Sequence, residues 1–330
     1  MNVLQNINIK MSLIGMFFLL NTLQNYAVTI PPHEHSDLEF FCDLCGCSTS
    51  GGSSGFGTLG NTSFVGLRYI YQDYKSRDGI FNNSPSSQER FNTYQVWSRI
   101  PLAEKFSVNT IIPYQDLFRE FEDRTEHING VGDITVIGWY QLNFFKKKPK
   151  DDNVDYNLNK EPSGHQLNFG LGFKLPTGEF EEKLTDRINP GFQVGTGSLD
   201  AIFSMMHTYS KNRMGINTSA TYYLKTENKN DYQFGNQLSL SSNAYYNVPL
   251  KKSALSPFLG ISADVYNAIK QFEETLPDTS GHMLNGALGT EFMINKIIIG
   301  ANYTFPIKQE LFGNNVTSKN RMIFYLNYAL

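Results

Sequence analysis

The last ten residues, Arg321-Met322-Ile323-Phe324-Tyr325-Leu326-Asn327-Tyr328-Ala329-Leu330, alternate between two kinds of side chain. Every second position is apolar or aromatic, and these positions are Met322, Phe324, Leu326, Tyr328 and Leu330. The intervening positions include Asn327 and Ala329, beside Ile323 and Tyr325. Side chains of a β-strand alternate between two faces, so this stretch predicts a strand with one apolar side. We expect it to be the closing strand of an outer-membrane β-barrel, and the alternative is the last strand of a soluble β-sandwich.

Composition narrows the choice. The 330 residues are 40% hydrophobic with a mean hydropathy of −0.33, which does not suit a bundle of transmembrane helices. Aromatic residues reach 14%, and a barrel uses them in its two interfacial girdles and on its lipid face. The net charge of −3 offers no basic stripe for phosphates, so we expect no nucleic-acid partner.

The N-terminus carries a single long apolar run, residues 11–20, which follows Lys10. Ten residues are too few to cross a bilayer but fit the apolar part of an export signal. We therefore predict a removable signal peptide over residues 1–27, with cleavage near Ala27. The alternative is a buried N-terminal helix.

From Asn61 onward the sequence is a series of alternating segments separated by polar, Gly- or Pro-containing loops. These segments predict an all-β fold, a transmembrane antiparallel barrel of about twelve strands over residues 61–330. The expected strands are 62–74, 91–100, 106–114, 132–145, 165–175, 197–209, 214–224, 232–248, 255–267, 283–294, 297–306 and 321–330.

Loop lengths support the barrel. With a periplasmic N-terminus, the connections that fall outside the cell are long or charged, and most periplasmic ones are short. The exception is the long, charged segment 146–164, which we interpret as a solvated insertion on the periplasmic side. Two stacked soluble sandwiches would not produce this asymmetry, and their strands would be shorter.

Three glycine-rich phrases stand out in this region: Gly130-Val131-Gly132-Asp133-Ile134, residues 171–178 (Leu-Gly-Phe-Lys-Leu-Pro-Thr-Gly) and residues 193–200 (Gln-Val-Gly-Thr-Gly-Ser-Leu-Asp). Through these phrases, residues 61–330 resemble the MetA-pathway phenol-degradation family. Members of that family are distantly similar to outer-membrane channels for fatty acids and aromatic hydrocarbons. The resemblance implies an outer-membrane barrel and a transport role.

The same phrases predict local structure. Gly130, Gly132, Gly195 and Gly197 stand where loops enter strands, where glycine allows a bulge, a positive φ or close backbone approach. Asp133 and Asp200 should point at the barrel rim or lumen, because a carboxylate on the lipid face is costly. We expect them to stabilise the rim; substrate binding is the alternative.

Soft ligands for a metal are clustered only on the short, flexible arm of residues 28–60, which ends in a Gly/Ser-rich linker. They are His33, His35, Cys42, Cys45 and Cys47. The Cys-x-x-Cys-x-Cys spacing lets thiolates converge on one ion, and thiolates select copper(I) or zinc. The Cys-Asp-x-Cys-Gly-Cys segment also resembles the start of some outer-membrane proteins of Bacteroidetes-type bacteria, which suggests a link to copper handling.

Two other interpretations of the cysteines remain open. An oxidising periplasm would tend to close a disulfide between two of them, leaving one thiol over. Lipid attachment is the third reading, although Phe40 and Phe41 before Cys42 lack the small residues of a lipoprotein cleavage site.

No acid/base or nucleophile set emerges, so we expect no enzyme activity. We interpret four charged residues, Glu179, Glu181, Glu182 and Lys183, as part of a solvated external loop. We interpret His207 as a girdle or packing residue, with a place in the lumen as the alternative. Two functions follow from the sequence: a transporter or channel for a small solute, with a periplasmic soft-metal arm, or a non-transporting barrel that anchors or docks other proteins. The expected partners are outer-membrane lipid, the barrel-assembly machinery, and a small solute or metal ion.

Overall fold

The computed structural model describes residues 62–77, 85–145, 163–184 and 188–330, all within the second of two compact units, Glu39–Leu330. The predicted signal peptide, the Cys/His arm and most of the insertion at 146–164 lie outside the described residues. Among the described residues, no helix has the length and apolar character needed to cross a membrane.

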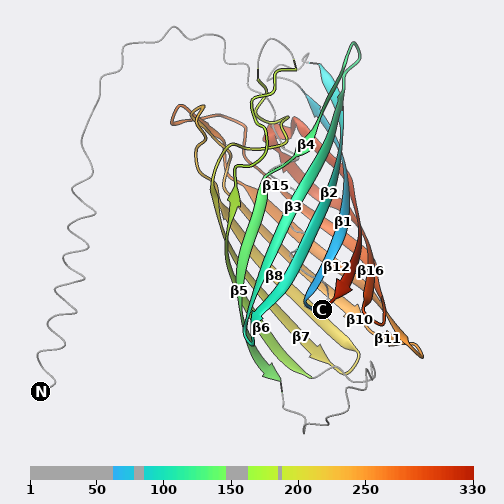
Figure 1. Ribbon diagram of the computed structural model, residues 1–330. Coiled ribbons are helices and arrows are strands. Elements are labelled where there is room, and N and C mark those ends of the chain that lie inside the picture. Colours follow the sequence, from blue (N-terminus) through green and yellow to red (C-terminus); the bar gives the residue numbers. More distant parts are fainter. Residues whose placement is uncertain (1–61, 78–84, 146–162, 185–187) are drawn as a thin grey trace, which may run out of the picture. The chain divides into compact units, whose positions relative to one another are not determined.

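The described chain is almost entirely β-structure (Figure 1). The strands of the wall are β1 (Phe64–Arg77), β2 (Ser86–Ala103), β3 (Phe106–Glu120), β4 (Thr125–Val131), β5 (Ile134–Phe145), β6 (Gly164–Leu175), β7 (Asp200–Lys211), β8 (Met214–Leu224), β10 (Gln237–Tyr246), β12 (Ser253–Tyr266), β15 (Gly281–Ile294), β16 (Ile297–Leu311) and β17 (Val316–Ala329). Short pieces lie in the connections: β9 (Tyr232–Gln233), β11 (Val248–Pro249), β13 (Lys270–Gln271), β14 (Glu274–Thr275) and the 3-10 turn η1 (Phe312–Asn314).

The wall closes on itself as the terminal sequence predicts. β17 pairs antiparallel with β1 from Phe64 opposite Ala329 to Ser76 opposite Val316, and its other edge pairs with β16. With β4 and β5 counted as two halves of one strand, the described residues form a closed antiparallel barrel of twelve strands. Closure leaves neither end strand with a free edge.

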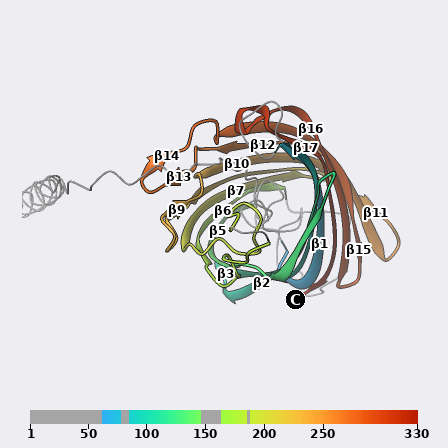
Figure 2. The same cartoon turned by 90° about the horizontal axis from the view of Figure 1, so that it is seen from above.

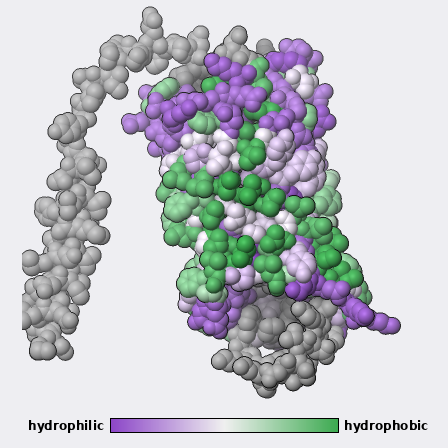
Figure 3. Space-filling model, viewed as in Figure 1, coloured by the Kyte–Doolittle hydropathy of each residue, from purple (hydrophilic) through white to green (hydrophobic). Residues whose placement is uncertain are grey.

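Side chains alternate between the lumen and the outside. On β17, Phe324, Leu326 and Tyr328 are about half exposed (50%, 50% and 52%), whereas the neighbouring Ile323 and Asn327 are buried (4% and 1%). The predicted apolar face of the last strand is therefore the outer face. Similar exposed residues on the other strands form an apolar belt between two polar ends (Figure 3), which matches the hydrocarbon layer of a membrane.

Aromatic pairs flank this belt. At one end Tyr69 and Tyr94 lie 5.1 Å apart between ring centroids, and Tyr94 is opposite Tyr114 across β2 and β3. At the other end Phe106 and Tyr140 lie 4.9 Å apart. Such pairs suit the two interfaces, where one part of a ring is apolar and the other is wet.

The barrel has a loop end and a turn end, as predicted, but long and short connections do not alternate strictly. Residues 121–124 and 312–315 are short connections at the loop end, because β3, β4, β16 and β17 extend into segments that were expected to be loops. At the turn end, residues 104–105, 212–213 and 295–296 suffice to join neighbouring strands. At the loop end, residues 176–199, 225–236 and 267–280 join β6 to β7, β8 to β10 and β12 to β15.

Three sequence predictions need correction. First, β4 lies in a segment that we expected to be loop, and it pairs with β3. The segment Thr125–Val131 extends a hairpin at the loop end. Its mixed composition obscures the alternation of polar and apolar residues by which a strand is predicted from sequence. The wall strand is then broken between β4 and β5, where Gly132 donates its N–H to the Pro113 carbonyl (2.9 Å) and Asp133 leaves the ladder.

Second, the expected strand 232–248 is divided into β9, β10 and β11. Tyr232 and Phe234 turn into a core at the loop end (4% and 3% exposed) instead of continuing the wall. Third, β7 begins at Asp200 and not at residue 197, because Gly197 has a positive φ of 69° and ends a loop there.

Candidate functional site

Between β6 and β7, the described residues 176–184 and 188–199 turn into the barrel mouth, and we call them the inner loop. Figure 2 shows it within the ring of strands. Of its described residues, Phe192, Gln193, Val194 and Thr196 are all at most 1% exposed. An ordinary surface loop would leave such side chains in solvent, so this one is built to occupy the lumen.

Apolar side chains hold the inner loop against the wall. Phe192 lies 6.2 Å from Phe91 on β2 between ring centroids, and the Arg119 guanidinium of β3 lies 4.5 Å from the Phe192 ring. The buried cluster around them combines wall and loop residues: Tyr74, Phe91, Leu117, Ile128, Phe192, Val194, Tyr232, Phe234, Tyr266, Ile269, Leu276, Met283, Leu311, Phe312 and Val316. The loops thus form an apolar cap over the loop end of the lumen.

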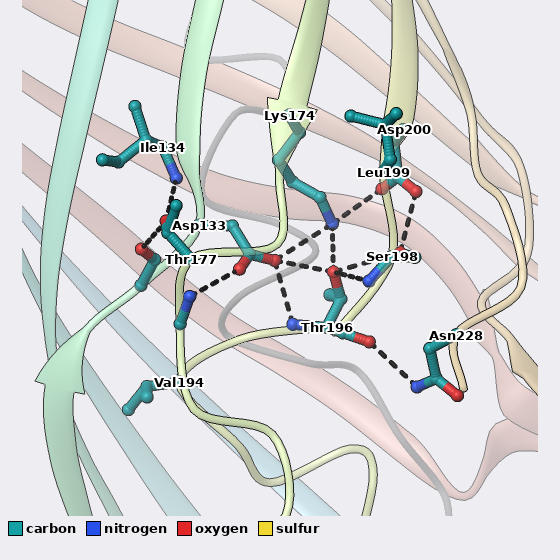
Figure 4. A network of polar contacts seen from close by, with 12 residues as sticks. Asp133, Ile134, Lys174, Thr177, Val194, Thr196, Ser198, Leu199, Asp200 and Asn228 are labelled. Carbon is teal, nitrogen blue, oxygen red and sulfur yellow. Dashed lines mark hydrogen bonds and ion pairs between the residues drawn. The ribbon is translucent and has the colours of Figure 1, made fainter. Parts of the chain in front are cut away.

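The side chain of Asp133 binds backbone N–H groups of the inner loop (Figure 4). Its Oδ1 accepts from the Gly178 N–H at 3.0 Å, where the loop begins. Its Oδ2 accepts from both the N–H (2.9 Å) and the hydroxyl (2.6 Å) of Thr196, near where the loop ends. The carboxylate therefore ties together two points of the loop that are distant in sequence.

Lys174 provides the cation of this network. Its Nζ lies 2.7 Å from Asp200 Oδ2 and 3.4 Å from Asp133 Oδ2, and it donates to the Thr196 hydroxyl at 2.6 Å (Figure 4). The Lys174 and Asp200 side chains are 9% and 2% exposed, so water screens the ion pair little. Asp200 also accepts from the Ser198 hydroxyl (2.8 Å) and the Thr226 N–H (3.1 Å). Buried charges persist only when paired and hydrogen-bonded in this way.

The next loop, residues 225–236, joins the same assembly. Asn228 donates from Nδ2 to the Thr196 carbonyl at 2.9 Å. At the surface, Lys229 lies 2.6 Å from Glu181. Hydrogen bonds from Lys229 and then Asn230 lower the pKa of the Glu181 carboxyl below its ordinary value. Glu181 thus belongs to a loop-to-loop contact rather than to an acid/base pair.

The geometry requires glycine at Gly195 and Gly197 of the inner loop. A Cβ at Gly195 would lie 2.3 Å from the Gly178 carbonyl oxygen, so the two backbones can approach only without one. Gly197 has a left-handed φ, and a Cβ there would also lie 2.5 Å from the Phe180 ring. By contrast, a Cβ at Gly130 would meet only Val194, at 3.5 Å, and nothing in the structure requires glycine there.

The structure therefore brings Asp133 and Asp200 together on Lys174, inside the lumen at the loop end. The sequence alone does not single out Lys174, although this residue lies in the Leu171–Gly178 phrase and alternates in step with the inward-facing Gly170 and Gly172. The predicted ligands His33, His35, Cys42, Cys45 and Cys47 lie outside the described residues. Among the residues that are described, no three His, Cys, Asp or Glu side chains are placed to hold a metal. His207 lies on the outer face, 3.0 Å from His165.

A solved outer-membrane channel shares this architecture. An outer-membrane channel from Pseudomonas putida F1 superposes with a TM-score of 0.59 at 11% identity, over 84% of this chain and 98% of that one. The β domain of the Bordetella autotransporter BrkA aligns at 9% identity and a TM-score of 0.48, over 82% of this chain and 100% of that one. At these identities the likeness concerns the fold alone.

No curated protein matches the sequence. The family model described as "Putative MetA-pathway of phenol degradation" matches residues 88–311, which run from β2 to the end of β16. This match includes the inner loop, Lys174 and both aspartates of the network. The chain is therefore an outer-membrane β-barrel that belongs to this family.

Proposed function

We propose that the protein is a gated channel for a small solute and that the inner loop is its gate. The observation that carries the proposal is the buried network of Asp133, Lys174, Thr196 and Asp200, which holds the loop inside the lumen. A barrel that served only as an anchor would not need its lumen closed by a loop with its own charge network. The fold of a similar channel and the polar lumen support the same reading.

In this arrangement the passage is closed at the loop end by the apolar cap. The inner loop leaves the wall at β6 and returns at β7, so it can move as a unit without breaking the pairing of β6 with β7. Removing its polar attachment should therefore open the passage and leave the barrel closed as a sheet.

Conductance of the full mature protein in planar bilayers tests this proposal. We expect wild-type protein to conduct rarely or in short openings, and a Lys174→Met variant to conduct more often. Solute flux into liposomes provides a second readout. If neither protein passes ions or solutes while both fold, the barrel is an anchor or docking module, which is the alternative function.

We also propose that the arm, facing the periplasm, binds copper(I) or zinc through Cys42, Cys45 and Cys47, with His33 and His35 completing the ligands. The spacing of the cysteines supports this proposal. Metal analysis of anaerobically purified protein, beside a triple Cys→Ser variant, tests it. A disulfide among the cysteines, with no stoichiometric metal, would contradict it.

A further inference from the structure

The turn end of the barrel is basic. The described turns there, with the strand residues next to them, carry six exposed basic side chains and one acidic side chain, Glu104. The six are Lys105, Lys211, Arg213, Lys251, Lys252 and Lys296. None of them forms an ion pair with another described residue. The turn end therefore presents a surplus of positive charge to its surroundings.

The connection between β5 and β6 does not reverse this sign. Its residues 146–162 lie outside the described part of the chain, and their sequence contains five basic and four acidic side chains. The loop end has the opposite balance. Its described connections together hold more acidic than basic side chains, and 267–280, with three acidic residues and one lysine, is an example. The two ends of the barrel thus differ in the sign of their charge.

One of the basic turns projects away from the wall. β11 pairs with the start of β12, and Leu250 donates its N–H to the Ser253 carbonyl at 2.7 Å. The two strands form a hairpin, residues 247–255, with Lys251 and Lys252 at its tip, and we call it the lysine hairpin. Figures 1 and 2 both show it, in orange, outside the ring of strands. Its tip lysines are therefore placed beside the barrel and not under the lumen.

The base of the lysine hairpin is fixed to its neighbours. Asn247 donates its N–H to the Arg213 carbonyl, in the turn between β7 and β8, at 2.7 Å. The Oδ1 of Asn247 also accepts from the Ser256 hydroxyl at 2.5 Å. These bonds hold the hairpin in its outward position and bring the turn that carries Lys211 and Arg213 beside it. The two basic turns form one surface.

Exposed apolar side chains flank the basic ones. Leu250, directly before the lysine pair, is 50% exposed, and Met214, directly after Arg213, is 65% exposed. Exposed apolar residues also adjoin the other two turns, and they are Leu102, Phe106, Ile294 and Ile297. At a membrane surface, apolar side chains enter the edge of the hydrocarbon while lysine and arginine extend to the headgroups. The pattern therefore suits the interface of a bilayer.

The short turns of outer-membrane barrels face the periplasm, so these side chains lie at the periplasmic leaflet. We propose that the lysine hairpin and the adjoining Lys211–Arg213 turn bind the phosphate groups of anionic phospholipids in that leaflet. Basic side chains next to a membrane attract anionic headgroups, and each adds to the attraction. The surface selects anionic lipids from the neutral lipids around them. This inference concerns the outside of the barrel and does not depend on the channel proposal.

Fluorescence quenching by brominated lipids tests the proposal at the hairpin itself. Trp97 and Trp139 are each 1% exposed, so a Leu250→Trp variant of the full mature protein adds one reporter at the membrane surface, and the parent protein supplies the background. Both are reconstituted in phosphatidylcholine vesicles with a minor fraction of brominated phosphatidylglycerol or, in a matched set, brominated phosphatidylcholine. We expect phosphatidylglycerol to quench the added reporter roughly threefold more strongly at low salt, and high salt to reduce this excess.

Charge variants in the Leu250→Trp background identify the binding residues. Lys251→Gln combined with Lys252→Gln should remove most of the excess quenching, because the two charges nearest the reporter are lost. Lys251→Arg combined with Lys252→Arg should keep it. Lys229→Gln combined with Lys270→Gln is the matched control, since it removes two exposed lysines at the loop end, and it should leave the excess unchanged.

The proposal is wrong if the two brominated lipids quench alike, if salt does not reduce the excess, or if the double glutamine variant keeps it in a folded barrel. An equal loss in the loop-end control would also overturn the proposal, because the attraction would then not belong to the turn end. A heat-modifiable gel shift checks that each barrel is folded. Failure of the channel proposal looks different: conductance would be absent, and the lipid preference would persist.

Discussion

The ammonium of Lys174, near the end of β6, lies 2.7 Å from the carboxylate of Asp200, the first residue of β7. The two residues are also opposite each other in the pairing of these strands. The ion pair therefore closes the base of the inner loop at the point where the chain leaves the wall and returns to it.

Lys174→Met should destabilise the closed barrel and increase channel opening. The change leaves two buried carboxylates without their cation, and breaking a buried pair on one side costs about 3–5 kcal/mol. Urea unfolding in liposomes measures the loss of stability, and single-channel recording measures opening. Lys229→Met is the matched control. This exposed lysine pairs with Glu181, so its loss should cost less than about 1 kcal/mol and leave opening unchanged.

Gly195→Ala should displace the inner loop, because the new methyl group would overlap the Gly178 carbonyl oxygen. We expect a loss of roughly 1–3 kcal/mol, typical of overpacking, together with more frequent opening. Gly130→Ala provides the comparison, since its Cβ has room beside Val194. Equal effects of the two substitutions on unfolding and conductance would show that the backbone contact does not hold the loop.

Phe192→Ala should loosen the apolar cap. The ring is fully buried and lies near Phe91 and the Arg119 guanidinium, so truncation should cost about 3–5 kcal/mol unless the loop escapes from the lumen. Proteolysis of the loop in folded barrels and the open probability both report such an escape. Phe173→Ala on the outer face of β6 should leave both readouts as in wild type.

Leu326→Arg should impair the stability of the barrel in lipid, because Leu326 lies on the outer face within the apolar belt. An arginine near the middle of the bilayer costs about 2–4 kcal/mol. Thr317→Arg places the same charge on the same strand, in the polar region beside Lys319, and should be tolerated. Folding yield into liposomes distinguishes the two; if both variants fold equally well, the assigned position of the membrane belt is wrong.

The sequence by itself determined the wall of the barrel. A period of two is a local property of extended chain, so Phe324, Leu326 and Tyr328 could be assigned to one face before any pairing was known. The lengths of the connections likewise predicted which ends of the strands lie together. Local signals failed where side chains leave the period, as at Asp133 between β4 and β5 and at Phe234 before β10.

Only the tertiary structure decided what fills the lumen. Asp133 and Asp200 could be predicted to avoid lipid, because burial of a charge in hydrocarbon is costly whatever the partner. Both carboxylates lie close to Lys174 because three strand ends and one loop meet at one point. The spacing of these residues in the sequence does not predict that meeting. The same holds for Arg68 and Arg321, which line one small cavity only because the last strand pairs with the first.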